Sequence, residues 1–163
     1  MEEVKRVITS HWHRDHTGGL LSFLELRKSS PTPCVVDVHP DRPIARGIAP
    51  GPLYDKVVAA LAPDPTFELI EKAGGVLEKH REGHLVAGGT VWVSGEIPRI
   101  TSFEDGILGG MRWVEDDGGK WVSDQVIVLE LFLSLKLMER QYIMDERYAA
   151  IDVAGKGLVI FSA

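Results

Sequence analysis

The first third of the chain consists of short apolar segments separated by polar or glycine-rich turns. Val4 to Thr9 and Cys34 to Val38 are rich in β-branched residues, which predicts two strands. Between them, a helix is expected to open at the Gly18-Gly19 pair and to run to about Arg27. This alternation of strands and helices favours a layered α/β fold.

The next part of the chain, from residue 39 to residue 74, predicts a loop followed by two helices. His39 to Pro52 holds four of the nine prolines, which indicates an ordered loop rather than a regular element. Helices are expected from Leu53 to Leu61 and from Thr66 to Lys72, on either side of a Pro63-Asp64-Pro65 break.

From Gly75 onward the pattern predicts mostly short strands. They are expected at Val76-Leu77, His84 to Ala87, Thr90 to Ser94, Asp152-Val153 and Leu158 to Phe161. The last two segments flank Gly155-Lys156-Gly157, which is typical of a hairpin turn. By contrast, Gly106 to Gly119 is rich in glycine and aspartate and predicts an exposed loop.

Composition narrows the function classes. The 163 residues contain 18 Lys and Arg against 24 Asp and Glu, and the net charge of −6 argues against a nucleic-acid partner. A single cysteine, Cys34, excludes a disulfide framework. The acidic start Met1-Glu2-Glu3 does not resemble a signal peptide, and the apolar run from Val126 to Met138 is too short and too polar for a membrane span. We therefore expect a cytoplasmic protein that acts on a small molecule, without membrane or nucleic-acid partners.

One segment concentrates the chemistry, because three of the six histidines lie between positions 11 and 16. In an extended chain, residues two apart point the same way, so His11 and His13 can converge while Trp12 faces the opposite side. Asp15 and His16 follow where the chain begins to turn, and they can address a second position nearby. Imidazole and carboxylate groups suit Zn²⁺, Mn²⁺ or Fe²⁺. The alternative is a surface histidine cluster that binds metal adventitiously.

The segment Ser10 to Gly19 resembles the metallo-β-lactamase superfamily, whose signature is His-x-His-x-Asp-His at the end of a strand. The later segments Gly95 to Arg99, Asp145-Glu146 and Gly155 to Val159 resemble the dihydropterin-(ribofuranosyl)aminobenzene-phosphate synthase-like branch of that superfamily. The resemblance implies an αββα sandwich with metals at one edge of two facing sheets.

The same resemblance assigns roles to individual residues. His11 and His13 match ligands of a first metal, and Asp15 and His16 match ligands of a second, with two Zn²⁺ ions in a complete site. Asp15 also matches the residue that orients the attacking water or accepts its proton. The implied activity is hydrolysis of an ester, lactone, thioester or phosphoester by a metal-activated water.

Two departures from the family pattern qualify these expectations. A further histidine ligand is expected just after a strand like Leu158 to Phe161, so residues 1–163 are interpreted as one partial domain, incomplete at both ends. This predicts weak metal retention and low turnover, and it leaves open a truncated, non-catalytic product that only binds metal or a partner. Residues 126–141 have no counterpart in the family pattern, and they are either an additional core element or a short intron read through in translation.

Six further residues carry weaker predictions. His39 lies near the expected pocket rim, where it is either a substrate contact or a hydrogen-bonded loop histidine. Arg99 either holds an anionic substrate group or forms a structural ion pair. His80 and His84 flank a charged turn and are expected to be solvated. The adjacent acids Asp145 and Glu146 either accept a hydrogen bond from a ligating imidazole or simply belong to a turn.

Overall fold

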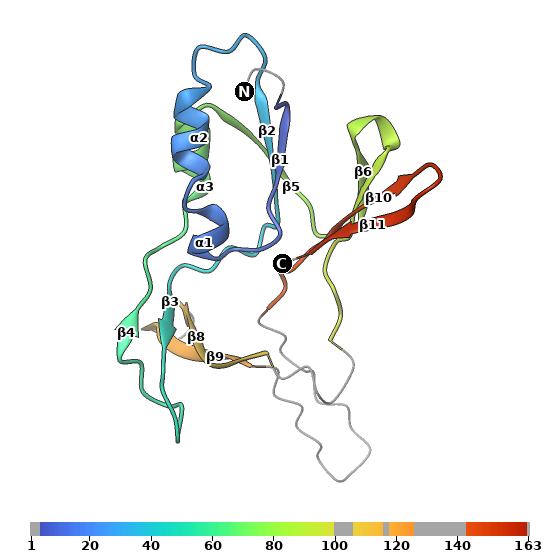
Figure 1. Ribbon diagram of the computed structural model, residues 1–163. Coiled ribbons are helices and arrows are strands. Elements are labelled where there is room, and N and C mark those ends of the chain that lie inside the picture. Colours follow the sequence, from blue (N-terminus) through green and yellow to red (C-terminus); the bar gives the residue numbers. More distant parts are fainter. Residues whose placement is uncertain (1–3, 100–105, 116–117, 126–142, 163) are drawn as a thin grey trace. The chain divides into compact units, whose positions relative to one another are not determined.

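The computed structural model describes residues 4–99, 106–115, 118–125 and 143–162 (Figure 1). They form two compact units. The first unit comprises Met1–Arg42, Asp64–Ile97 and Asp145–Ala163, and the second comprises Pro43–Pro63 and Pro98–Met144. The insertion expected at residues 126–141 lies outside the described residues, and the prediction of one partial domain stays a prediction.

A three-stranded parallel sheet organises the first unit. Its order is β1-β2-β5, with β1 at Arg6–Ile8, β2 at Cys34–Val38 and β5 at Gly75–Lys79. Figure 1 shows the three helices beside this sheet: α1 at Arg14–Thr17, α2 at Leu20–Leu26 and α3 at Phe67–Lys72. The strands and helices expected in this part of the chain are therefore confirmed, with ends that differ by a few residues.

The hydrophobic core of this unit lies between the sheet and the helices. On β2, Cys34, Val36 and Val38 pack with Leu24 and Ile70 from α2 and α3 in one buried cluster. Burial raises the pKa of the Cys34 thiol, which keeps it protonated and unreactive. Because side chains alternate along a strand, Asp37 points to the other face of the sheet.

Local signals explain the ends of α3. The Thr66 hydroxyl accepts a hydrogen bond from the Leu69 backbone N–H at 3.2 Å, which caps the first turn. After the helix, Gly74 has a φ of +97°, a conformation that favours glycine. At Gly75 a Cβ atom would lie 2.9 Å from side-chain carbons of Ile70 and Val36, so glycine permits the close approach of helix and sheet.

The first unit also contains an antiparallel sheet with the order β11-β10-β7-β6. Its strands are β6 at His84–Val86, β7 at Val91–Val93, β10 at Ala149–Val153 and β11 at Gly157–Phe161, and a short 3₁₀ turn occupies Ala87–Gly89. The expected hairpin is confirmed, since Val153 pairs with Gly157 across a turn in which Gly155 and Gly157 have positive φ.

The second unit contains a sheet with the order β4-β3-β8-β9 and corrects two expectations. The strands are β3 at Arg46–Ile48, β4 at Ala59–Ala60, β8 at Gly106–Val114 and β9 at Lys120–Gln125. The helix expected from Leu53 to Leu61 is wrong, because this segment forms turns and then pairs with β3. His39 to Pro52 likewise is not entirely loop, since it contains β3.

The loop expected from Gly106 to Gly119 is also wrong, because most of it forms β8. The glycines of this strand serve close packing: a Cβ atom at Gly109 would lie 2.5 Å from the carbonyl oxygen of Ala49. The buried pair of Arg46 and Asp124, 2.8 Å apart, adds a polar contact within the unit. None of the helices in the described part of the chain is long and apolar enough to cross a membrane.

Candidate metal centre

A short loop connects β1 to α1 and carries the histidine motif. His13 precedes α1 with an extended backbone, at φ −132° and ψ 144°. Its carbonyl oxygen accepts hydrogen bonds from the backbone N–H groups of His16 and Thr17, both at 2.9 Å. The chain therefore changes from extended to helical directly after His13, as the motif predicted, and His16 is brought back over the loop.

The loop gathers the three imidazole rings. The ring centroid of His11 lies 4.6 Å from that of His13 and 4.3 Å from that of His16. We call His11, His13 and His16 the histidine cluster. Asp15 lies beside it, because its Oδ2 is 3.4 Å from Nε2 of His16. With 81% of its side chain exposed, the Asp15 carboxylate is open to water.

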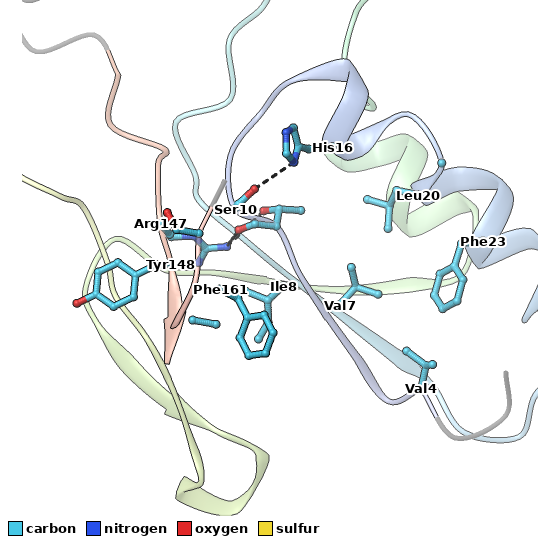
Figure 2. Close-up of a pocket in the computed structure, with 14 residues that line it drawn as sticks. Val4, Val7, Ile8, Ser10, His16, Leu20, Phe23, Arg147, Tyr148 and Phe161 are labelled. Carbon is cyan, nitrogen blue, oxygen red and sulfur yellow. Dashed lines mark hydrogen bonds between the residues drawn. The ribbon is translucent and has the colours of Figure 1, made fainter. Parts of the chain in front are cut away.

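Ser10 contacts two of these rings, and Figure 2 shows its contact with His16. Its hydroxyl lies 3.1 Å from Nδ1 of His11 and 3.5 Å from Nδ1 of His16. Contact at Nδ1 directs the opposite edge of each ring, which carries Nε2, away from Ser10. A histidine that ligates a metal through one nitrogen is usually oriented by a hydrogen bond at the other, and Ser10 supplies that contact here.

Replacing Ser10 by alanine is expected to lower the affinity for Zn²⁺ by about 10–100-fold, because both rings lose the contact at Nδ1 that orients them. Competition with a chromogenic chelator measures this affinity. Ser22→Ala, an exposed serine on α2, is the matched control and should leave it unchanged. Equal affinities for the Ser10 and Ser22 variants would contradict an orienting role.

Trp12 anchors the loop on the side opposite His11 and His13. It is fully buried in the core cluster, and its indole N–H donates to the carbonyl oxygen of His39 at 2.9 Å. Its backbone N–H donates to the Asp145 carboxylate at 2.6 Å. Asp145 therefore supports the loop through the backbone of Trp12.

Arg147, which the sequence analysis did not single out, holds the other end of the loop. Its backbone N–H donates to the carbonyl oxygen of Ser10 at 2.8 Å, and its guanidinium donates to that of Thr9 at 2.8 Å. The segment from Asp145 to Arg147 therefore fixes the loop both before and after His11. The signal in the sequence was a third charged residue directly after the Asp145-Glu146 motif.

Asp37 is the acidic partner of Arg147 on the sheet face away from the helices. Its Oδ1 lies 3.0 Å from the Arg147 guanidinium, and its Oδ2 lies 2.8 Å from both Arg6 and Nε2 of His84. Burial alone would raise the pKa of Asp37, but hydrogen bonds from His84 and Arg147 outweigh it and hold this pKa below its ordinary value. A carboxylate inside an apolar strand was the sequence signal for this network.

In the described part of the chain, the side chains whose ligand atoms lie within 4.8 Å of one another, as a metal ion requires, are Asp37, His80 and His84 rather than the histidine cluster. The rings of His80 and His84 are stacked, with centroids 3.8 Å apart, and His84 is only 17% exposed, so its expected solvation is wrong. Two guanidinium groups already bind the Asp37 carboxylate and would repel a cation. We therefore keep the histidine cluster with Asp15 as the candidate metal centre, because of its sequence motif and not because of the spacing of its ligand atoms.

For His39, two alternatives were expected, a substrate contact or a hydrogen-bonded loop histidine, and the structure shows the hydrogen bonds of the second. His39 is buried, its Nδ1 accepts the backbone N–H of Asp41 at 3.1 Å, and its Nε2 donates to Glu96 at 3.0 Å. Burial lowers the pKa of His39 despite the nearby Glu96 carboxylate, so the ring is neutral at pH 7. Arg99 belongs to the second unit, and its substrate contact stays a prediction.

Known proteins resemble this chain in sequence and in fold. The sequence model described as the metallo-beta-lactamase superfamily matches residues 2–140. The structure of Tm1679, described as a metal-dependent hydrolase of the beta-lactamase superfamily, aligns over 97% of this chain with a TM-score of 0.59 and 15% sequence identity. The alignment covers 45% of that protein, so this chain spans less than half its length. No curated protein sequence matches the chain. On the match over residues 2–140, the chain belongs to the metallo-β-lactamase superfamily.

Proposed function

We propose that the chain carries the metal-binding loop of a hydrolase that uses a metal-activated water on an ester, lactone, thioester or phosphoester. The observation that supports this most directly is the gathering of three imidazole rings, with the Asp15 carboxylate beside them, at the end of β1. Superfamily membership supports the same chemistry at a coarser level.

The donor groups fit zinc. Neutral imidazole and carboxylate are common ligands of this ion, and Ser10 contacts Nδ1 of two of the rings. His11 and His13 would hold one ion, and Asp15 and His16 would hold a second; the same donors also accept Mn²⁺ or Fe²⁺. When bound, such ions supply Lewis acidity and lower the pKa of water towards about 7.

We assign to Asp15 the role of accepting the proton of the attacking water. Its carboxylate is exposed to water and close to His16, so it can orient the attacking water and accept its proton. In the reaction, the water oxygen would bond to the carbonyl or phosphoryl centre while its proton passes to Asp15, and the bond to the leaving alkoxide or thiolate would break; the proton on Asp15 is then available to that leaving group. The leaving group then takes up a proton, and the product is an acid.

Metal removal tests this proposal. The four donors are fewer than two catalytic ions usually take from a protein, so we expect less than two equivalents of metal to remain after desalting. Hydrolysis should be absent after chelation and appear on addition of Zn²⁺ or Mn²⁺, measured on a panel of esters, thioesters, lactones and phosphodiesters. Binding of metal without hydrolysis of any panel member would favour the non-catalytic alternative.

A cytoplasmic location is also part of the proposal, and fractionation of cells checks it.

A further inference from the structure

An apolar cavity of about 580 Å³ opens beside the histidine cluster, entirely within the first unit (Figure 2). Its apolar walls come mainly from β1, α2 and β11. They are formed by Val7 and Ile8 of β1, Leu20 and Phe23 of α2, and Phe161 of β11. Its size falls within the range of small-molecule sites in proteins.

Polar groups are distributed unevenly around this cavity. Ser10 and His16 lie together at one end, whereas Val4 and Phe23 lie at the other (Figure 2). The guanidinium of Arg147, which also lines the cavity, is engaged by Asp37 and the Thr9 carbonyl group. A ligand that fits this distribution has an apolar tail and a polar group at the end near His16.

From this arrangement we infer that the cavity binds the acyl chain of an ester or thioester substrate, with the polar end of the acyl group directed towards Ser10 and the Nδ1 edge of His16. This inference rests on the proposed function, because His16 belongs to the candidate metal centre. It narrows the substrate from four classes of hydrolysable bond to acyl compounds with an apolar chain.

Gly19 is a position at which the lining of the cavity can be changed without disturbing the fold. It lines the cavity just before α2, and a Cβ atom built there meets no atom within 4 Å. Its backbone, at φ −86° and ψ −10°, suits any L-residue. Gly18 is different, because a Cβ atom there would lie 2.5 Å from the carbonyl oxygen of Arg14. Gly19→Leu therefore adds an apolar side chain in open space.

The test measures binding by the metal-free chain, so that it does not depend on hydrolysis. Butanoate, hexanoate, octanoate and decanoate compete with a dansyl-labelled fatty acid, and displacement is followed by fluorescence. Each methylene that enters the cavity should tighten binding about fourfold, equivalent to about 0.8 kcal/mol, until the cavity is full. Gly19→Leu should weaken decanoate binding at least about 10-fold, since its side chain takes the space of two methylenes or more.

Two further variants control the test. Ser22→Leu adds the same side chain at an exposed position of α2 outside the cavity, and it should bind decanoate like the unmodified chain. Phe23→Ala removes part of the wall at the apolar end of the cavity. The chain length at which the affinity stops rising should therefore shift to longer acids. Affinities that do not depend on chain length, or equal losses for Gly19→Leu and Ser22→Leu, would overturn the inference. If affinity depends on chain length but no substrate is hydrolysed, the acyl-binding cavity is supported and the proposed hydrolase activity is refuted.

Discussion

Asp15→Asn is expected to lower kcat/KM of the metal-loaded chain by about 10²–10⁴-fold on its best ester substrate. The amide has almost the shape of the carboxylate, but it cannot take the proton from the attacking water. It also removes one negative charge beside His16, 3.4 Å away, so metal at that position should be held more weakly. Initial rates at saturating Zn²⁺ separate the loss of the proton acceptor from the loss of metal.

Glu25→Gln is the matched control for Asp15→Asn. Glu25 is an exposed acid on α2 whose contact is a lysine at 3.4 Å, so its neutralisation changes the net charge equally without affecting the loop. It should leave kcat/KM within about twofold of the unmodified chain, since an exposed pair contributes little. Two results would remove Asp15 from the mechanism: equal rates for both variants, or full recovery of the asparagine variant at high metal concentration.

The elements that could be predicted from the sequence are those with strong local signals. The parallel strand Cys34–Val38 is apolar except for Asp37, and α3 has the Thr66 cap at its start and Gly74 after its end. The histidine motif is also local, since its three rings lie within six positions, in the loop after β1 and the first turn of α1. Its convergence could therefore be predicted without knowledge of the rest of the fold.

The failures come from interactions between distant parts of the chain. The Gly106–Val114 segment looked like a loop because of its glycines, but pairing with β3 and β9 makes it a strand. His84 seemed solvated until the fold placed it 2.8 Å from Asp37, which lies 47 positions earlier. Arg147 lies 110 positions from Asp37, and no local pattern joins two such residues.

Arg147→Met is expected to lower the free energy of unfolding by about 3–5 kcal/mol. Methionine keeps much of the apolar stem but leaves the buried carboxylate of Asp37 without one of its cationic partners. The carbonyl oxygen of Thr9, at the start of the histidine loop, also loses its bond to the guanidinium. Urea denaturation followed by tryptophan fluorescence measures this loss.

The pH dependence separates loss of the charge pair from loss of packing. Because the folded chain holds the pKa of Asp37 below its ordinary value of 3.8, the stability from this carboxylate is present above that pH and is lost as pH falls through the lower folded-state pKa. Arg147→Met should raise the folded-state pKa of Asp37 and shrink this acid-dependent loss. Arg81→Met, which breaks a more exposed pair with Glu96, should cost about 1 kcal/mol or less. If both arginine variants lost equal stability with unchanged pH profiles, the buried pair would not be what secures the loop.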